Sequence, residues 1–456
     1  MDARQERELF EKWDVTKAVF YLAFPTVAGQ IILVIYNMAD TFFVGLAGND
    51  ATIAAVTVCM PAFMFLSAIS NLFGIGGASV ISRALGAKER ERVKLTAAFS
   101  FWGCLAVTAL YCAMAFVLKD IYVDLLGGTN PAVHKSAVLY LMCTVAAGGI
   151  PTSIGVLFSH LIRSEGRSFQ ASIGIALGGI LNIILDPIFM YRILPPGNEA
   201  LGGAIATLLS NVIALLYFMI VLLCIRKNSS LAFFPSGRML GAAVRRPVLS
   251  AGLPACMMTL MENISYAVLD KLMSLEGLPM QTGIGVAKKV NMLAHCIVRG
   301  IAQGSLPLIG YNYAAKNLQR MKDSVRVAHR IAVCMALLCM AAYLVFARQL
   351  IGIVIHHAST SLDYGMIFLR ILCIGGPFSA SAYTFISFFQ AVGSTRRSFF
   401  LAILRKGVID IPLMFILGAL LPVYGIVLAT PLADALCCLE AHRMFHHYLA
   451  VKVGFH

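Results

Sequence analysis

Long apolar runs fill most of this chain, and polar positions concentrate in the short segments between them. Each run has roughly 20 residues or more, which is enough for an α-helix to cross about 30 Å of hydrocarbon. The pattern predicts about twelve such helices, near residues 17–46, 52–82, 95–118, 136–162, 168–191, 202–225, 247–275, 284–314, 327–347, 362–391, 398–420 and 424–441. The expected fold class is therefore an all-α polytopic membrane protein.

The second half of the pattern repeats the first half in order. Pro25 has a counterpart in Pro254, about 229 positions later, and Gly149-Ile150-Pro151 is matched by Gly375-Gly376-Pro377. A near-constant offset over most of the chain indicates gene duplication, and each copy holds six of the predicted helices. Because six is an even number, both copies must enter the membrane in the same orientation. We expect two parallel six-helix repeats related by an axis along the membrane normal.

Composition and charge agree with a membrane location. Hydrophobic residues make up 59% of the chain and charged residues 13%, with a mean hydropathy of +0.82, which is more apolar surface than a soluble fold can bury. The net charge of +14 would suggest a nucleic-acid partner in a soluble domain, but the bases here cluster in alternate loops, at 83–94, 163–167, 226–246 and 316–330. The positive-inside rule then places both termini in the cytoplasm. We expect a multi-pass protein of the cytoplasmic (inner) membrane with no nucleic-acid partner.

The repeat and the charge pattern together divide the chain into three parts. We expect an N-lobe over residues 1–225 with helices 1–6, a cytoplasmic linker over 226–246, and a C-lobe over 247–456 with helices 7–12. Nothing in the sequence indicates a bound cofactor, a structural metal or a catalytic group, so we do not expect an enzyme. The lipid bilayer is the expected surrounding, and we expect a monomer.

Acidic and amide side chains inside the apolar runs are candidates for the working site. An ionised Asp at the centre of a membrane helix costs roughly 2.5–3.5 kcal/mol, so such residues usually line a site or a water-filled path. Asp40 lies on the first predicted helix, where helical spacing places Asn37 and Tyr36 on the same face. Asn182 and Asp186, four positions apart, share a face of the fifth helix.

Distance from the helix ends places these side chains at similar depth. Asp40, Asp186 and Thr207 of the sixth helix each lie about five residues from an outer helix end, or roughly 8 Å inside at 1.5 Å per residue. Asn182 lies one turn deeper. Two carboxylates, an amide and a hydroxyl suit Na⁺ or a shared proton. A structural alternative is that Asp186 caps its helix before Pro187 while Asp40 bonds to neighbouring helices.

The second half of the chain differs because bases accompany its acids. Glu262 and Asp270 on the seventh helix, with Lys289 and Arg299 on the eighth, form a possible C-lobe site. Opposite charges that can pair favour a structural network, or a lining for substrates of mixed charge, over a dedicated cation site.

The chain resembles the multidrug and toxic compound extrusion (MATE) transporters over essentially its whole length. The segments YNMADTFFVG and GIGGASVISRALGAKERER carry much of the resemblance. Asp40, Asn182, Asp186 and Thr207 match, residue by residue, the N-lobe cation site of the branch that includes archaeal and DNA-damage-inducible members. Pro25 resembles the proline at which the first helix bends in that branch.

One feature of another bacterial branch is only half present. Glu262 resembles the acid that this branch carries on helix 7, but the acid on its helix 10 is missing from GGPFSASAYTFISFFQAVG. The departure weakens any ion site in the C-lobe.

The resemblance implies a twelve-helix antiporter, in which Na⁺ or H⁺ runs inward while an organic, often cationic, compound leaves through the cleft between the lobes. The main alternative is a flippase of the same superfamily that moves a lipid-linked sugar. A polytopic membrane enzyme is another, with His356-His357 as its outer candidate. A channel is a third, although duplicated halves with single buried acids favour alternating access.

Overall fold

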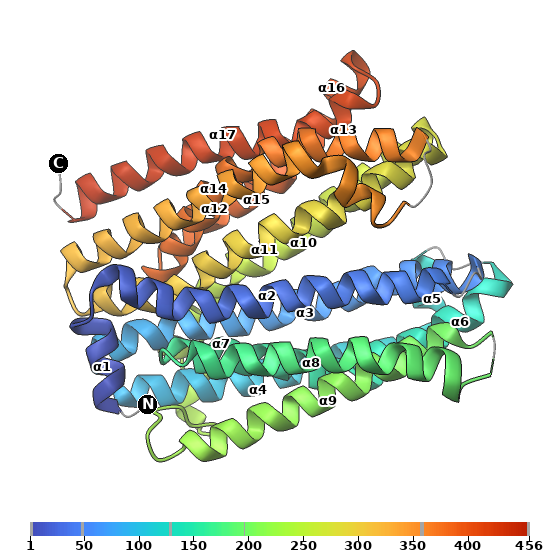
Figure 1. The fold of residues 1–456 in the computed structure, drawn as a ribbon. Coiled ribbons are helices and arrows are strands. Elements are labelled where there is room, and N and C mark those ends of the chain that lie inside the picture. Colours follow the sequence, from blue (N-terminus) through green and yellow to red (C-terminus); the bar gives the residue numbers. More distant parts are fainter. Residues whose placement is uncertain (1–2, 47–49, 127–129, 196, 356–359, 454–456) are drawn as a thin grey trace. The chain divides into compact units, whose positions relative to one another are not determined.

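The computed structural model describes residues 3–46, 50–126, 130–195, 197–355 and 360–453, and helices dominate all of these ranges (Figure 1). The histidine pair at 356–357 lies outside the described residues. The chain forms two compact units. Unit 1 comprises residues 1–8 and 28–252, and unit 2 comprises residues 9–27 and 253–456.

Unit 1 contains the second part of α2 and the helices that follow it. Within it α3 packs against α4 and α7, and α8 lies beside α9 (Figure 1). The elements, including the short α1 that precedes α2, are α1 (Ala3–Glu11), α2 (Val15–Leu46), α3 (Asp50–Gly86), α4 (Arg90–Val117), α5 (Lys119–Leu125), α6 (Pro131–Leu141), the π-helical η1 (Met142–Ala147), α7 (Gly149–Ser164), α8 (Ser168–Ile188), the π-helical η2 (Phe189–Ile193), α9 (Glu199–Ile225) and the 3₁₀ turn η3 (Gly237–Leu240).

Unit 2 is built mainly from the second repeat. Within it α11 packs against α12, α13 and α14, and α17 packs against α14 and α16. The elements are α10 (Ala242–Glu276), α11 (Leu278–Ala314), α12 (Leu318–Gly352), α13 (Thr360–Ile374), α14 (Gly376–Ala391), α15 (Thr395–Ile403), the π-helical η4 (Leu404–Ile409), α16 (Asp410–Leu420), α17 (Tyr424–Tyr448) and the π-helical η5 (Leu449–Val453).

The helices account for the predicted spans. Within the described ranges, eight helices are long and apolar enough to cross a membrane, and two bent pairs of helices meet the same requirement together. α10 and the interrupted segment α15–η4–α16 carry several charged residues, and with them the helices follow the order of the twelve predicted ones. The predicted fold class, an all-α polytopic membrane protein, is confirmed.

Both repeats bend at the matched glycine–proline motifs. The axis turns by 45° between residues 133–147 and α7, and by 44° between α13 and α14. Pro151 and Pro377 lie just after these bends, where each ring removes a backbone hydrogen bond and crowds the preceding turn. Gly166 and Gly393, which are also matched, both have positive φ, of 85° and 75°, at the turns that end α7 and α14. The duplication is therefore visible in local geometry.

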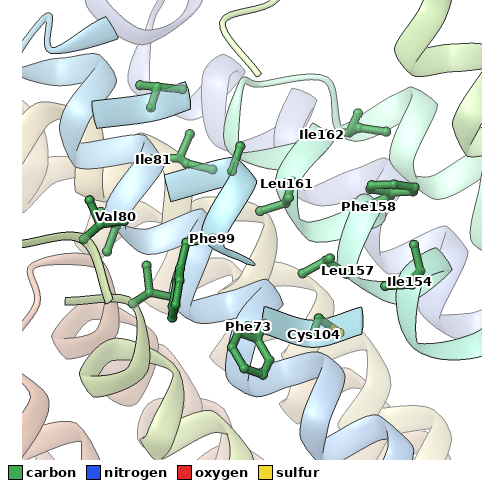
Figure 2. Packing of buried hydrophobic residues seen from close by; sticks show 14 of the residues in the cluster. Phe73, Val80, Ile81, Phe99, Cys104, Ile154, Leu157, Phe158, Leu161 and Ile162 are labelled. Atoms are coloured by element: carbon green, nitrogen blue, oxygen red, sulfur yellow. The ribbon is translucent and has the colours of Figure 1, made fainter. Parts of the chain in front are cut away.

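The core of unit 1 is an apolar cluster between α3, α4 and α7 (Figure 2). Phe73, Phe99 and Phe158 are among its buried members, and Val244 and Val248 of α10 also belong to it. In lipid the hydrophobic effect contributes little to helix association, so close packing of this kind stabilises the unit.

Three helices change unit along their length: α1 between residues 8 and 9, α2 between residues 27 and 28, and α10 between residues 252 and 253. Glycines permit close contacts just before the changes in α2 and α10. A Cβ on Gly304 of α11 would lie 2.6 Å from the Cα of Ala23, and a Cβ on Gly252 would lie 1.7 Å from the carbonyl oxygen of Leu72. The compact units thus differ from the predicted lobes, whose boundaries at 225 and 247 remain predictions about the repeat.

Candidate functional site

Small residues bring the second part of α2 close to α8. Gly29 of α2 faces Ser172, and Gly179 of α8 faces Ile32 and Tyr36. A Cβ on Gly179 would lie 3.0 Å from Ile32 Cγ2 and 3.5 Å from Tyr36 Cδ1, so a methyl group there would displace a neighbour. Close backbone approach at small residues is a common basis of helix association in membranes. These contacts hold the face of α2 that carries Tyr36 against α8.

Three side chains from α8 and α9 form a hydrogen-bonded group. Asn182 Nδ2 donates to Asp186 Oδ1 at 3.4 Å and to Thr207 Oγ1 at 3.2 Å. Asp186 is completely buried and Asn182 is 2% exposed. The spacing of four residues on α8 places the amide and the carboxylate on one face, as the sequence predicts.

Asp40 of α2 is close enough to this group to interact with it electrostatically. Its charge acts on Asp186, and both acids act on Tyr36. On α9, a Cβ at Gly203 would lie 3.7 Å from Asp40 Oδ1, so the carboxylate reaches that helix where it has no side chain. Two acidic groups therefore lie in one region of unit 1, where Asp186 is buried and Asp40 is partly exposed.

Two oxygens of the site, Asn182 Oδ1 and Asp186 Oδ2, have no hydrogen-bond partner among the residues that the structure describes. Both are acceptors in a buried place, where leaving an acceptor unsatisfied costs about 1–3 kcal/mol. The sequence has no Lys or Arg on α2 after Lys17, and none on α8 or α9. A proton or a cation would satisfy these oxygens, and carboxylate, amide and hydroxyl oxygens are the ligands that hard cations prefer.

In the described part of the chain, no group of three or more His, Cys, Asp or Glu side chains is arranged to hold a metal ion. The polar groups of the site are two carboxylates, an amide and a hydroxyl.

The other residues of the predicted N-lobe site occupy different places. Asn37 donates to the carbonyl of Leu33 on its own helix at 2.7 Å. Pro25 lies in the part of α2 that belongs to unit 2. Tyr140 of α6 interacts electrostatically with Asp40 and Asp186, and the sequence analysis missed it. No spacing rule connects a tyrosine on a separate helix, about 100 positions away, with Asp40.

In unit 2 the predicted acids are paired with bases. Glu262 Oε2 accepts from Arg299 at 2.7 Å. The Tyr383 hydroxyl accepts from Arg299 at 3.1 Å and donates to Glu262 Oε1 at 3.2 Å, closing a three-membered group. Asp270 pairs with Lys288 at 2.5 Å, and the neighbouring Lys289 is half-buried.

A deeper pair joins α17 to the π-helical turn η4. Arg405 Nε lies 2.7 Å from Asp434 Oδ1, and both side chains are 1% exposed. The guanidinium also lies over the ring of Tyr383, 4.2 Å from its centroid. The contact links this pair to the group around Glu262.

The next residue of η4 forms a second deep pair. Lys406 Nζ lies 2.9 Å from Asp410 Oδ2, with 1% and 0% of the side chains exposed. Ser265 and Thr430 donate to the same carboxylate at 2.7 and 3.0 Å. Its charge is thus balanced and its oxygens are hydrogen-bonded.

Comparison with known proteins agrees with this architecture. The chain is 29% identical over 433 residues to the multidrug export protein MepA of Staphylococcus saprophyticus, covering 95% of this chain and 94% of that protein. MepA of Staphylococcus aureus strain MRSA252 is 26% identical over 438 residues, with the same coverage.

Solved structures show the same fold. A MATE in complex with MaL6 matches with a TM-score of 0.90 and 24% identity, over 98% of this chain and 99% of that one. An outward-facing multidrug resistance MATE family transporter of the MOP superfamily matches with a TM-score of 0.88 and 22% identity, over 98% of both chains.

The family model described as MatE matches twice, over residues 25–188 and 254–416. The two matches start 229 positions apart, as the two prolines of the repeat do. Together they cover most of the chain and include the helices that carry Asp40, Asn182, Asp186 and Glu262. The chain therefore belongs to the MatE family, the MATE transporters that its sequence resembles, and it is a multi-pass membrane transporter rather than an enzyme.

Proposed function

We propose that the protein exports organic, often cationic, compounds across the cytoplasmic membrane in exchange for Na⁺ or H⁺. The observation that carries the coupling is the buried Asp186, which interacts electrostatically with Asp40 and lies beside Asn182. Asn182 Oδ1 and Asp186 Oδ2 have no hydrogen-bond partner among the described residues. The export direction is supported by the relatives, which are named multidrug export proteins. Both termini face the cytoplasm in this proposal, because the bases cluster in alternate loops.

The physical basis of coupling is the cost of holding two negative charges near one another when one of them, on Asp186, is buried. Binding of one cation, or one proton, lowers that cost and favours the conformation in which the acids are shielded from water. A compound and a cation that prefer different conformations exclude one another through the shared equilibrium, which gives exchange. Each 100 mV of membrane potential supplies about 2.3 kcal/mol per elementary charge moved inward.

Asn182 and Thr207 prepare the site for this role. The amide N–H groups of Asn182 are directed to Asp186 and Thr207, so the amide oxygen is left as an acceptor. The hydroxyl of Thr207 receives one of these bonds and keeps its own hydrogen available. A Na⁺ ion would meet oxygens from three residue types, whereas a proton would bind to one carboxylate and be shared with the other.

The flippase alternative has less support from the charges of unit 2. A strongly cationic lining would favour an anionic lipid-linked sugar, but Arg299, Arg405 and Lys406 each pair with an acid. Their positive charge is neutralised inside the protein.

The test is dye transport in inverted membrane vesicles under sodium and pH gradients imposed separately. Dye should enter the lumen only when the lumen holds the higher Na⁺ or H⁺ concentration, and reversal of that gradient should reverse the flux. The Asp40→Asn variant should reach the membrane in normal amount and give no gradient-driven flux. Dye movement that is independent of both gradients would exclude the proposal.

A further inference from the structure

The segment that joins the two repeats, residues 226–241, is tied to the end of α7. We call it the strap. Glu165, which is 1% exposed, accepts a hydrogen bond from the Ser229 hydroxyl at 2.7 Å and another from the Ser230 amide at 2.8 Å. Burial raises the pKa of Glu165, and the two bonds from the strap oppose that rise by stabilising the charged form. The strap thus has a fixed attachment at its start.

A second attachment holds the middle of the strap. Phe233 packs edge-on against Phe101 and Phe158, with ring centroids 5.6 and 5.4 Å away. The indole N–H of Trp102 donates to the Phe233 carbonyl at 2.9 Å. Phe233 and its neighbour Leu231 pack against the apolar core of unit 1.

The next aromatic side chain is exposed. Phe234 is 78% exposed although it follows the inward-facing Phe233, and Leu240 is 59% exposed. Around Phe234 the strap has no helix, and in extended chain successive side chains point to opposite sides. Attachment through Phe233 therefore holds Phe234 outward.

The strap also concentrates positive charge. No Asp or Glu occurs between Glu199 and Glu262. Five exposed bases lie on the strap and on the first turn of α10, namely Arg226, Lys227, Arg238, Arg245 and Arg246. α9, which ends at Ile225, is apolar enough to span a membrane, so the strap begins where a spanning helix ends (Figure 1).

We infer that the strap binds anionic lipid headgroups of the membrane leaflet at this end of α9, with Phe234 and Leu240 inserted among the lipids and the five bases contacting the headgroups. Exposed aromatic side chains are favoured at the boundary between headgroups and acyl chains. Clustered bases next to a spanning helix are attracted by anionic lipids. A soluble protein partner would explain the charge, but not why the strap starts at a membrane boundary with Phe234 and Leu240 exposed.

Fluorescence quenching in vesicles tests this directly. The test variant is Phe234→Trp, and the unchanged protein serves as the reference for the fluorescence of the two native tryptophans. The full chain is reconstituted in phosphatidylcholine containing either brominated phosphatidylglycerol or brominated phosphatidylcholine. We expect brominated phosphatidylglycerol to quench the fluorescence of the added tryptophan at least about twofold more strongly than brominated phosphatidylcholine does. This preference should weaken as the salt concentration is raised.

Two triple variants distinguish the effect of the bases around the strap from the effect of other exposed bases. The first triple variant carries Phe234→Trp together with Arg238→Gln, Arg245→Gln and Arg246→Gln. In this variant, quenching by brominated phosphatidylglycerol should fall to the level seen with brominated phosphatidylcholine. The matched control removes three exposed bases from unit 2, through Lys316→Gln, Arg326→Gln and Arg330→Gln, and should keep the preference. Equal quenching by both lipids, no quenching by either, or an equal loss in the control would each overturn the inference. No transported compound takes part, so the result is independent of the proposed export.

Discussion

The two units of the protein use buried charge in opposite ways. In unit 1, Asp40 and Asp186 share one region, and the helices that carry them and Thr207 have no base at that level. In unit 2, Asp434 and Asp410 each pair with a buried base of the same unit. A buried pair that supplies its own countercharge is a structural element, whereas in our proposal the region around Asp186 binds a cation or a proton from solution.

A matched position shows how duplication allowed this difference. Thr207 and Thr430 correspond in the two repeats. Thr207 accepts a hydrogen bond from the Asn182 amide, while Thr430 donates to the ion-paired Asp410. The same hydroxyl thus takes part in a cation site in one repeat, under our proposal, and in a charge-balanced network in the other.

The largest expected effect comes from Asp186→Asn. The change removes one charge of the acid pair and keeps the shape of the side chain, so gradient-driven export should fall below detection while the amount of protein in the membrane stays normal. Dye efflux from cells or vesicles is the measurement. The control is Asp120→Asn, which changes an acid with 63% side-chain exposure outside the site and should leave efflux unchanged. Normal efflux by the Asp186 variant would remove the basis of the comparison.

Breaking one of the two deep pairs of unit 2 should affect folding first. Asp434→Asn leaves the Arg405 guanidinium buried beside a neutral partner, which costs about 3–5 kcal/mol of unfolding free energy. Thermal unfolding in detergent measures the loss. The double change Arg405→Met with Asp434→Leu removes both charges and should recover most of the stability. A single variant as stable as the original protein would show that the pair is not structural.

A smaller loss is expected at the Glu262 pair, because its side chains are 28% (Arg299) and 11% (Glu262) exposed. Glu262→Gln should cost about 1–3 kcal/mol, since Arg299 keeps its bond with Tyr383. Efflux should decrease only in proportion to the folded protein. Complete loss of efflux in a well-folded Glu262→Gln protein would instead assign ion coupling to unit 2.

The smallest effect is expected at Lys288. Its partner Asp270 is 46% exposed, and half-exposed ion pairs contribute less than about 1 kcal/mol. Lys288→Gln should therefore leave both the unfolding midpoint and efflux close to normal. A loss as large as that of Asp434→Asn would show that exposure does not rank these pairs.

The sequence was sufficient for the helices and for the repeat. Apolar length defines a membrane span, and the matched motifs around Pro151 and Pro377 both produce bends of similar size. The short amphipathic α1 was not predicted, because its contacts are distant in sequence. Leu9 and Phe10 are buried, and Arg320 Nε donates to the carbonyl of Phe10 at 2.7 Å.

The site was predictable only in part. Residue counting along helices placed Asp186 and Thr207 at similar depth and Asn182 one turn deeper, and the structure brings Asn182 into hydrogen-bonding distance of both. The choice of partners in unit 2 was not predictable. Arg405 and Lys406 are adjacent, yet they reach acids 29 and four positions away, because the π-helical turn η4 and the neighbouring α17 set their directions.

Infrared spectroscopy of carboxyl groups during a Na⁺ titration tests the central claim most directly. If the site binds a proton, the purified protein near neutral pH without Na⁺ should show a protonated carboxyl band that added Na⁺ removes. If the site binds only Na⁺, the protein should show no such band and should bind the added Na⁺. Either signal should be absent from Asp186→Asn and present in Glu262→Gln. Two ionised carboxylates that bind neither a proton nor Na⁺, or spectra identical in the original protein and Asp186→Asn, would contradict the account.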